Sequence, residues 1–136
     1  MAGGKDQRGA LEILIAEDGL QTRQFLSYLL GREFNVFITQ AKNGNDVIRQ
    51  LASSTPHLLI LDINMPEKSG IEVLKEIEPK HYKFPILIIS GYYTSKEEIM
   101  NIVSTSKDRV FFLKKPFEAG ELLTEVKKIL NLPDKR

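Results

Sequence analysis

The chain has 136 residues, a length typical of a single domain with a substantial core. Its net charge is +1 with both signs interspersed, so no basic stripe indicates nucleic-acid binding, and the lack of cysteine excludes disulfides and thiolate metal sites. No apolar run approaches the roughly 18 residues of a membrane helix. These features favour a soluble, cytoplasmic protein with no membrane contact.

Five apolar runs alternate with five amphipathic stretches along the chain. The runs predict strands and the stretches predict helices, in the order strand 12–18, helix 20–31, strand 34–40, helix 45–52, strand 57–62, helix 70–78, strand 84–90, helix 95–104, strand 109–115 and helix 118–130. Gly31 is expected to cap the first helix, and Ser95 begins a capping-box pattern with Glu98. The second run alternates in polarity, which indicates a strand near the edge of the sheet.

This alternation predicts an α/β fold with a doubly wound, five-stranded parallel sheet and helices on both faces. We expect one domain over residues 11–132, after a flexible leader at residues 1–10 and before a tail at residues 133–136. In such sheets ligands bind outside the carboxyl ends of the strands. The residues at those ends are therefore the candidates for a functional site.

The predicted strand ends carry a distinct set of polar residues. The first strand ends in Glu17 and Asp18, the third in Asp62, the fourth in Ser90, and the fifth in Lys115. Three neighbouring carboxylates repel one another unless a cation offsets them, and oxygen ligands suit a hard divalent ion such as Mg²⁺. A metal site beside a hydroxyl and an ammonium group is suited to phosphate, and Asp62 is the best-placed nucleophile.

Each of these residues also has a simpler explanation. Asp18 can be a helix N-cap, Asp62 a turn residue, Ser90 a polar loop residue and Lys115 a solvated lysine. Five groups at four strand ends, all on one side of the sheet, are not expected from turn chemistry alone. The combination therefore favours a phosphate-handling site.

The motifs "ILIAED", "LLILDINMPEKSG", "ILIISG" and "FFLKKPF" occur in an order and at spacings that resemble the receiver domain of two-component response regulators. The resemblance extends from about Leu11 to Leu130 and implies a flavodoxin-like sheet of strand order 2-1-3-4-5. It also implies that Asp62 accepts a phosphoryl group from a histidine kinase. Magnesium would be held by Asp18 and Asp62, by Glu17, and by the main-chain carbonyl of Asn64.

The resemblance implies further roles around this site. Ser90 would contact the phosphoryl group, Lys115 would pair with it, and the Lys115–Pro116 bond would be cis. Phe112 matches an aromatic switch residue, although from sequence it is equally a core residue of a strand. The fourth helix, fifth strand and fifth helix would form the output face, which binds a downstream protein or an output domain. Phosphorylation-dependent homodimerisation through that face is left open.

The sequence departs from the usual receiver pattern at several positions. The acid pair is Glu-Asp, Ser90 replaces the commoner threonine, Gly91 replaces alanine, and Phe112 lacks a tyrosine hydroxyl. Residues flanking the site, Asn64 and Tyr92, are expected to tune hydrolysis of the acyl phosphate.

As a signalling switch, the protein is expected to show only self-phosphorylation from phosphodonors and slow autodephosphorylation, and not enzyme turnover. Two other functions are also considered. One is a small magnesium-dependent phosphatase of the haloacid-dehalogenase type with an aspartate nucleophile. Such enzymes normally carry a second acid two residues after the nucleophile, where this chain has Asn64. The other is a docking module that works without phosphorylation, which the complete set of acids, hydroxyl and lysine disfavours.

Overall fold

The sheet determines where every candidate residue lies. The computed structural model describes residues 10–91 and 96–133. Its five parallel strands have the order β2-β1-β3-β4-β5, which confirms the predicted fold. The strands are β1 (Leu11–Ala16), β2 (Val36–Ala41), β3 (Leu58–Asp62), β4 (Ile86–Ser90) and β5 (Val110–Lys114).

The described ranges also contain five α-helices and two short 3₁₀ turns. They are α1 (Leu20–Glu33), α2 (Gly44–Ser53), α3 (Gly70–Ile77), η1 (Glu78–Lys80), α4 (Lys96–Ile102), η2 (Lys107–Arg109) and α5 (Ala119–Leu130). All of them connect strands except α5, which follows β5. None of the helices in the described part of the chain is long and apolar enough to cross a membrane.

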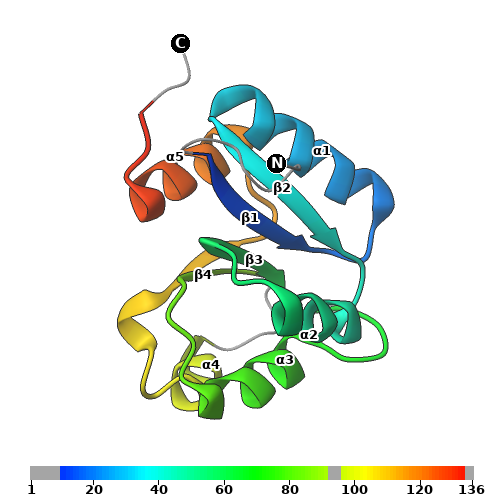
Figure 1. Cartoon of the computed structure of the whole chain (residues 1–136), viewed down its shortest axis with the longest axis vertical. Helices are drawn as coiled ribbons and strands as arrows, with labels where there is room; N and C mark the ends of the chain where they lie inside the picture. Colours follow the sequence, from blue (N-terminus) through cyan, green and yellow to red (C-terminus); the bar gives the residue numbers. More distant parts are fainter. Residues whose placement is uncertain (1–9, 92–95, 134–136) are drawn as a thin grey trace.

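The helices form a layer on each face of the sheet. Helices α1 and α5 cover one face, and α2, α3 and α4 cover the other (Figure 1). Alternate residues of the strands contribute to two separate apolar clusters: Ile13 and Ile15 belong to the α1/α5 side, whereas Leu14 and Ala16 belong to the opposite side. Both faces of the central strands are thus covered, which explains their continuous apolar sequence.

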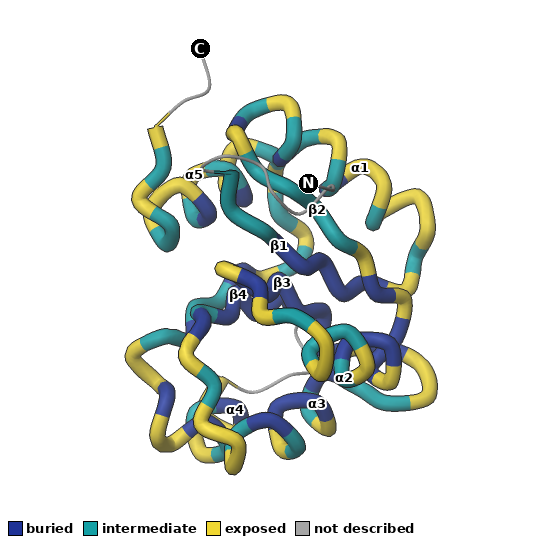
Figure 2. The backbone as a smooth tube through the Cα atoms, viewed as in Figure 1, coloured by how far each residue is buried: buried dark blue, intermediate teal, exposed yellow. Residues whose placement is uncertain are grey.

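Strand β3 is the most deeply buried of the strands that end at the carboxyl edge of the sheet. Leu58, Leu59, Ile60 and Leu61 are each 0% exposed, and the strand then ends on the Asp62 carboxylate. By contrast, β2 lies at the sheet edge and is mostly half-buried, as its alternating sequence predicts (Figure 2). A rigid, apolar strand therefore delivers a charged side chain to the carboxyl edge of the sheet.

The prediction that Gly31 caps α1 is wrong. The helix continues through Gly31 to Glu33, and the amide of Phe34 donates to the carbonyl of Leu30 at 2.9 Å. Leu30 and Phe34 are both 0% exposed, so burial of these two side chains one turn apart keeps the chain helical past the glycine. Packing outweighs the roughly 1 kcal/mol that glycine costs within a helix.

The other helix ends follow local sequence closely. Asn43 caps α2 by accepting from the Asp46 amide at 2.8 Å, and Ser69 and Glu72 form a capping box at the start of α3. Helix α4 ends at Ile102, two residues before the predicted end, and its predicted cap Ser95 lies outside the described residues.

Two glycines allow the chain to pack closely below the site. A Cβ on Gly44 would lie 2.1 Å from the carbonyl oxygen of Lys68, and one on Gly70 would lie 2.7 Å from the carbonyl oxygen of Asp62. The Gly44 amide donates to Lys68 and the Gly70 amide donates to Ile63, at 2.9 and 2.8 Å. Glycine is required here by proximity, and these contacts fix the β3–α3 loop that contains Asn64.

Candidate functional site

The carboxyl edge of the sheet brings together the residues that the strand ends predicted. Glu17 and Asp18 follow β1 directly, and Asp62 ends the neighbouring strand β3. Ser90 ends β4, next to β3, and Lys115 follows β5. We call these five residues the acidic rim. The simpler explanation of Asp18 as a helix cap does not hold, because Gly19 occupies the N-cap position of α1.

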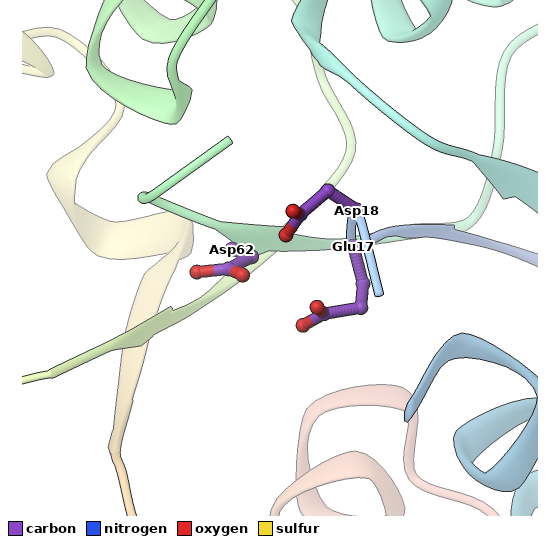
Figure 3. A group of neighbouring side chains, drawn as sticks. All are labelled: Glu17, Asp18 and Asp62. Carbon is purple, nitrogen blue, oxygen red and sulfur yellow. The ribbon is translucent and has the colours of Figure 1, made fainter. Parts of the chain in front are cut away.

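Three carboxylates of the rim converge. Oxygen atoms of Glu17, Asp18 and Asp62 all lie within 4.8 Å of one another, and their side chains approach from the ends of β1 and β3 (Figure 3). Glu17 and Asp62 are 6% and 2% exposed, whereas Asp18 is exposed to solvent. The cluster therefore opens to solvent on the side of Asp18.

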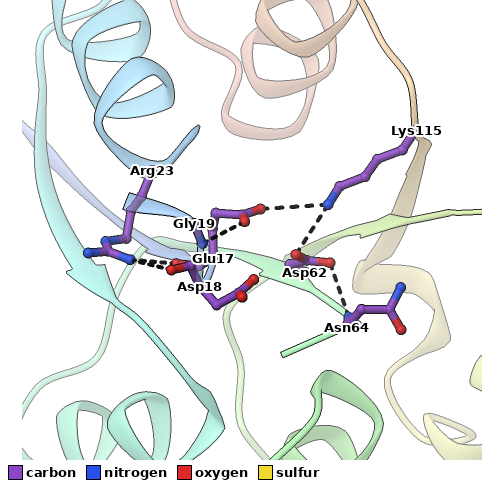
Figure 4. Close-up of polar contacts among 7 residues, drawn as sticks. All are labelled: Glu17, Asp18, Gly19, Arg23, Asp62, Asn64 and Lys115. Atoms are coloured by element: carbon purple, nitrogen blue, oxygen red, sulfur yellow. Dashed lines mark hydrogen bonds and ion pairs between the residues drawn. The ribbon is translucent and has the colours of Figure 1, made fainter. Parts of the chain in front are cut away.

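Two nitrogen donors contact the Asp62 carboxylate, one at each oxygen. Lys115 donates from Nζ to Oδ2 at 3.2 Å, and the main-chain amide of Asn64 donates to Oδ1 at 3.1 Å (Figure 4). Lys115 also lies 3.7 Å from Oε1 of Glu17, so one ammonium group faces two buried carboxylates. These contacts orient the Asp62 carboxylate but do not balance the total charge of the rim.

The pKa of Glu17 shows the effect of burial and of a neighbouring carboxylate. Burial raises the pKa of Glu17 above its usual value of 4.5, and the neighbouring Asp62 carboxylate raises this pKa further. The hydrogen bond from the Gly19 amide, 3.0 Å from Oε2, and the charge of Lys115 act in the opposite direction without cancelling the rise. A buried carboxyl group that resists ionisation beside two other acids is the environment that a bound cation would relieve.

The donor set fits a hard divalent ion. All three side chains offer carboxylate oxygens, and the arrangement contains no histidine or cysteine ligand. Oxygen ligands from few residues, open to solvent on one side, suit Mg²⁺, which keeps several of its waters.

The phosphate-binding candidates lie on the other side of Asp62. Ser90 is 9% exposed at the end of β4, and its carbonyl accepts from the Lys115 amide at 2.8 Å. The Lys115–Pro116 peptide bond is cis. Ser90 pairs with Lys114, the residue before Lys115, and Asp62 pairs with Ile89, the residue before Ser90, so both candidates lie near Asp62 at the carboxyl edge.

Two further candidate residues lie outside this arrangement. Phe112 lies on β5 opposite Ile88 of β4 and is half-buried, and Nζ of Lys96 lies 5.1 Å from the centre of its ring. Tyr92 lies outside the described residues.

One residue that contacts the rim, Arg23, was not predicted from the sequence. Nη1 of Arg23 on α1 donates to the main-chain carbonyls of Glu17 and Asp18, at 2.8 and 3.3 Å. A signal was present in the sequence, because a basic residue in the first turns of a helix opposes the helix dipole and needs another explanation.

Comparison with known proteins identifies the family. The model of the response regulator receiver domain matches residues 13–127. This chain belongs to the response regulator receiver domain family. Receiver domains are signalling domains that take phosphoryl groups from histidine kinases and generally bind Mg²⁺ at an acidic pocket, and this chain has a cluster of three carboxylates.

Individual relatives have both short and long chains. The receiver chain is 31% identical over 122 residues to the chemotaxis protein CheY of Bacillus subtilis, covering 90% of this chain and 99% of CheY. It is 30% identical over 122 residues to response regulator RR06 of Streptococcus pneumoniae, covering 88% of this chain but only 53% of that regulator. The chain therefore spans about half the length of RR06 and nearly all of CheY.

Solved structures agree with the fold. The signal receiver domain of a signal transduction histidine kinase from Syntrophus aciditrophicus superimposes with a TM-score of 0.74 at 25% identity, covering 90% of this chain and 91% of that one. Receiver domains of this architecture thus occur in kinases as well as in regulators.

Proposed function

We propose that this receiver domain is a phosphorylation-controlled switch whose phosphoacceptor is Asp62. The observation that carries the proposal is the position of the Asp62 carboxylate. It is 2% exposed, it contacts Lys115 and the Asn64 amide, and it lies beside the carboxylates of Glu17 and Asp18. A buried carboxylate oriented in this way is ready to act as a nucleophile toward phosphorus.

The proposed reaction forms one bond and breaks one bond. A carboxylate oxygen of Asp62 attacks the phosphorus of a phosphohistidine or a small phosphodonor, and the bond from phosphorus to the donor breaks. The donor group leaves with that electron pair, and Asp62 becomes an acyl phosphate. The ammonium group of Lys115, now 3.2 Å from Asp62, and the hydroxyl of Ser90 donate to the phosphoryl oxygens.

We assign the cation site to Glu17, Asp18 and Asp62, together with the main-chain carbonyl of Asn64. Bound there, Mg²⁺ would neutralise charge on the phosphoryl oxygens as the bond to the donor breaks. Asp18, the exposed member, is accessible for direct ligation, whereas Glu17 is fixed by Gly19 and faces Lys115. Glu17 therefore suits contact through a water molecule.

The switch acts through a change in equilibrium between two states. Phosphorylation replaces the Asp62 carboxylate with a larger and more charged group, which favours the state in which Ser90 and Lys115 bind it better. Phe112, half-buried on β5, is the proposed aromatic reporter of that change. The output face would comprise α4, β5 and α5, with a downstream protein, an output domain or a second copy as its partner.

The phosphodonor is proposed to be a histidine kinase that approaches beside the rim. The large apolar side chains most exposed in the described residues all lie on α1, which begins two positions after Asp18; they are Leu20, Phe25 and Tyr28. Exposed apolar side chains next to a reactive group indicate a contact surface for a protein partner.

Phosphorylation from a small donor tests the proposal directly. Wild-type protein incubated with acetyl phosphate and MgCl₂ should gain one phosphoryl group, detected as a mass increase that hydroxylamine removes. Asp62→Asn should gain none, and Glu78→Gln, on the opposite edge of the sheet, should behave like wild type. Labelling of Asp62→Asn at the wild-type level would overturn the assignment, and steady turnover of p-nitrophenyl phosphate would instead favour the phosphatase.

A further inference from the structure

Arg23 connects the acid pair to the edge strand of the sheet. Its Nη1 donates to the carbonyls of Glu17 and Asp18, and its Nε donates to Oε1 of Gln40 on β2 at 3.0 Å. Arg23 is half-buried, and its guanidinium lies on the side of the acids opposite Lys115 (Figure 4). One side chain of α1 thereby links the β1–α1 loop to β2.

The choice of acceptors is informative. A guanidinium next to three acids would ordinarily be expected to pair with a carboxylate, in bidentate fashion. Arg23 instead donates to main-chain oxygens of Glu17 and Asp18, and the carboxylate oxygens of these residues point toward Asp62 (Figure 3). The contact fixes the backbone of the acid pair while leaving its carboxylates directed at the cation site.

Gln40, which accepts from Arg23, is itself held by a hydrogen bond from α2. The main-chain carbonyl of Gln40 accepts from Nε2 of Gln50 on α2 at 2.6 Å. The amide of Glu17 donates to the carbonyl of Ala41 at 3.0 Å, which extends the β1–β2 pairing by one residue. The acid pair is therefore tied to β2 twice, once through its own backbone and once through Arg23.

We propose that Arg23, through Gln40, is a positioning residue that sets the affinity of the acidic rim for its cation. The inference rests on the proposed magnesium site and deepens it. Asp18 is exposed and follows the last residue of β1 by only two positions, so its carboxylate is held near those of Glu17 and Asp62 chiefly by the conformation of its backbone. Releasing that backbone lowers the effective concentration of ligand oxygens around the ion.

Lysine cannot reproduce this arrangement. The guanidinium reaches two carbonyls and an amide oxygen because its donors form a planar fork, whereas an ammonium group is a single point on a flexible stem. Arg23→Lys therefore keeps the charge near the acids but removes the fork. Arg32→Lys is the matched control, because Arg32 lies exposed at the far end of the same helix.

The test is a magnesium titration of the unphosphorylated protein, followed by amide resonances in ¹H–¹⁵N spectra, with the Gly19 amide as the reporter. Arg23→Lys should raise the dissociation constant for magnesium by about 10-fold, which is the lower end of the range for groups that orient metal ligands. Gln40→Ala should raise the same dissociation constant by about threefold, which corresponds to the free energy of one hydrogen bond. The double variant should match Arg23→Lys rather than multiply the two effects, because both changes break one connection.

Each outcome separates the proposals. If Arg23→Lys and Gln40→Ala bind magnesium as wild type does, the positioning role is wrong, even if their melting temperatures fall. Equal weakening in Arg32→Lys would also overturn it, because the effect would then be one of general charge. If wild-type protein shows no magnesium-dependent shift, the proposed metal site itself fails and this inference with it.

Discussion

Carboxylates at the two ends of the sheet lie in opposite electrostatic environments. At the carboxyl edge, the acidic rim brings three carboxylates together, and one lysine faces two of them, Glu17 and Asp62. At the opposite edge lies a group that we call the basal network, made of Glu78, Tyr82, Thr105, Ser106 and Arg109. Glu17 has a raised pKa and Glu78 a lowered one, so the same side-chain type meets opposite environments within one domain.

The basal network is a set of matched donors and acceptors. One oxygen of the Glu78 carboxylate accepts from the amide and the hydroxyl of Thr105, and the other accepts from the hydroxyl of Ser106 at 2.9 Å. Ser106, which is 0% exposed, also contacts the hydroxyl of Tyr82 at 2.7 Å, and Arg109 donates to the Tyr82 carbonyl. Burial alone would raise the pKa of Glu78, but these hydrogen bonds outweigh it and lower the pKa.

The two groups of acids differ in whether their charge is balanced by contacts within the protein. Glu78 contacts residues far from it in sequence and joins η1 to the segment before β5. Hydrogen bonds within the protein therefore compensate its negative charge. The rim leaves charge uncompensated at a solvent-open position, which lowers stability and, under the proposed function, favours binding of a cation and a phosphoryl group. Removing charge should therefore stabilise one end of the sheet and destabilise the other.

The largest expected effect is on phosphorylation. Asp62→Asn should abolish acyl phosphate formation, because an amide cannot serve as the nucleophile, whereas Glu78→Gln should leave the extent of labelling unchanged. Intact-protein mass spectrometry after treatment with acetyl phosphate measures both variants in one experiment. A Glu78→Gln protein that folds but does not accept phosphate would break the comparison, because the two ends would then not be independent.

The next effect concerns the backbone beneath the rim. Gly70→Ala would place a Cβ 2.7 Å from the carbonyl oxygen of Asp62 and from Cα of Ile63, so the β3–α3 loop must shift. We expect a loss of about 2 kcal/mol in unfolding free energy, together with weaker magnesium binding, measured by urea denaturation and titration.

Gly31→Ala is the matched control for that change. It meets nothing within 4 Å and lies inside α1, so it should raise stability by up to about 1 kcal/mol and leave magnesium binding unchanged. A Gly70→Ala protein as stable as wild type would show that the loop has room to relax.

The third prediction uses pH to separate the two carboxylates in metal-free protein. The folded-state pKa of Glu78 is lowered, so its stabilisation is present above the ordinary value of 4.5 and is lost as pH falls through the lower folded value. The pKa of Glu17 is raised, so stability is highest below 4.5 and falls as pH rises through the folded value. The two groups therefore give pH profiles of opposite sign.

Neutralising variants make that difference measurable. At pH 7 with EDTA, Glu78→Gln should be less stable than wild type and Glu17→Gln more stable, by chemical denaturation. The Glu17→Gln advantage should disappear near pH 4, and added MgCl₂ should reduce it at pH 7 by stabilising only wild type. Two variants that shift stability in the same direction at pH 7 would contradict the contrast between the two ends.

The sequence was sufficient for features that depend on short segments. Apolar runs predicted all five strands, and the parallel fold brings their carboxyl ends to one edge, so Glu17, Asp18, Asp62 and Lys115 could be grouped without coordinates. Helix caps such as Asn43 are equally local.

Features that depend on the rotation of a helix or on distant pairing could not be predicted in this way. The contact of Arg23 with Gln40 joins residues 17 apart, and that of Glu78 with Thr105 joins residues 27 apart. Gly31 failed as a helix stop because Phe34, only three residues on, is buried by the fold as a whole. At Gly31, burial of the large side chains of Leu30 and Phe34 outweighed the local preference of glycine to end a helix.

The smallest predicted effect concerns α4, which lies between the two regions. Near its start, Lys96 places Nζ 5.1 Å from the ring centre of Phe112, and the segment after its end is tied to Glu78 through Thr105 and Ser106. A cation over an aromatic ring at an exposed site contributes about 0.5 kcal/mol, so Lys96 should favour the half-buried position of Phe112.

Lys96→Met removes that cation and keeps a side chain of similar length, so Phe112 should turn inward more readily. The affinity for beryllofluoride in the presence of magnesium should then rise by about twofold, the factor that corresponds to about 0.5 kcal/mol. Lys107→Met, an exposed lysine in η2 near the basal network, is the matched control and should leave this affinity unchanged. A weaker affinity in Lys96→Met would contradict this prediction, because the lysine would then favour the phosphorylated state rather than the half-buried position of Phe112.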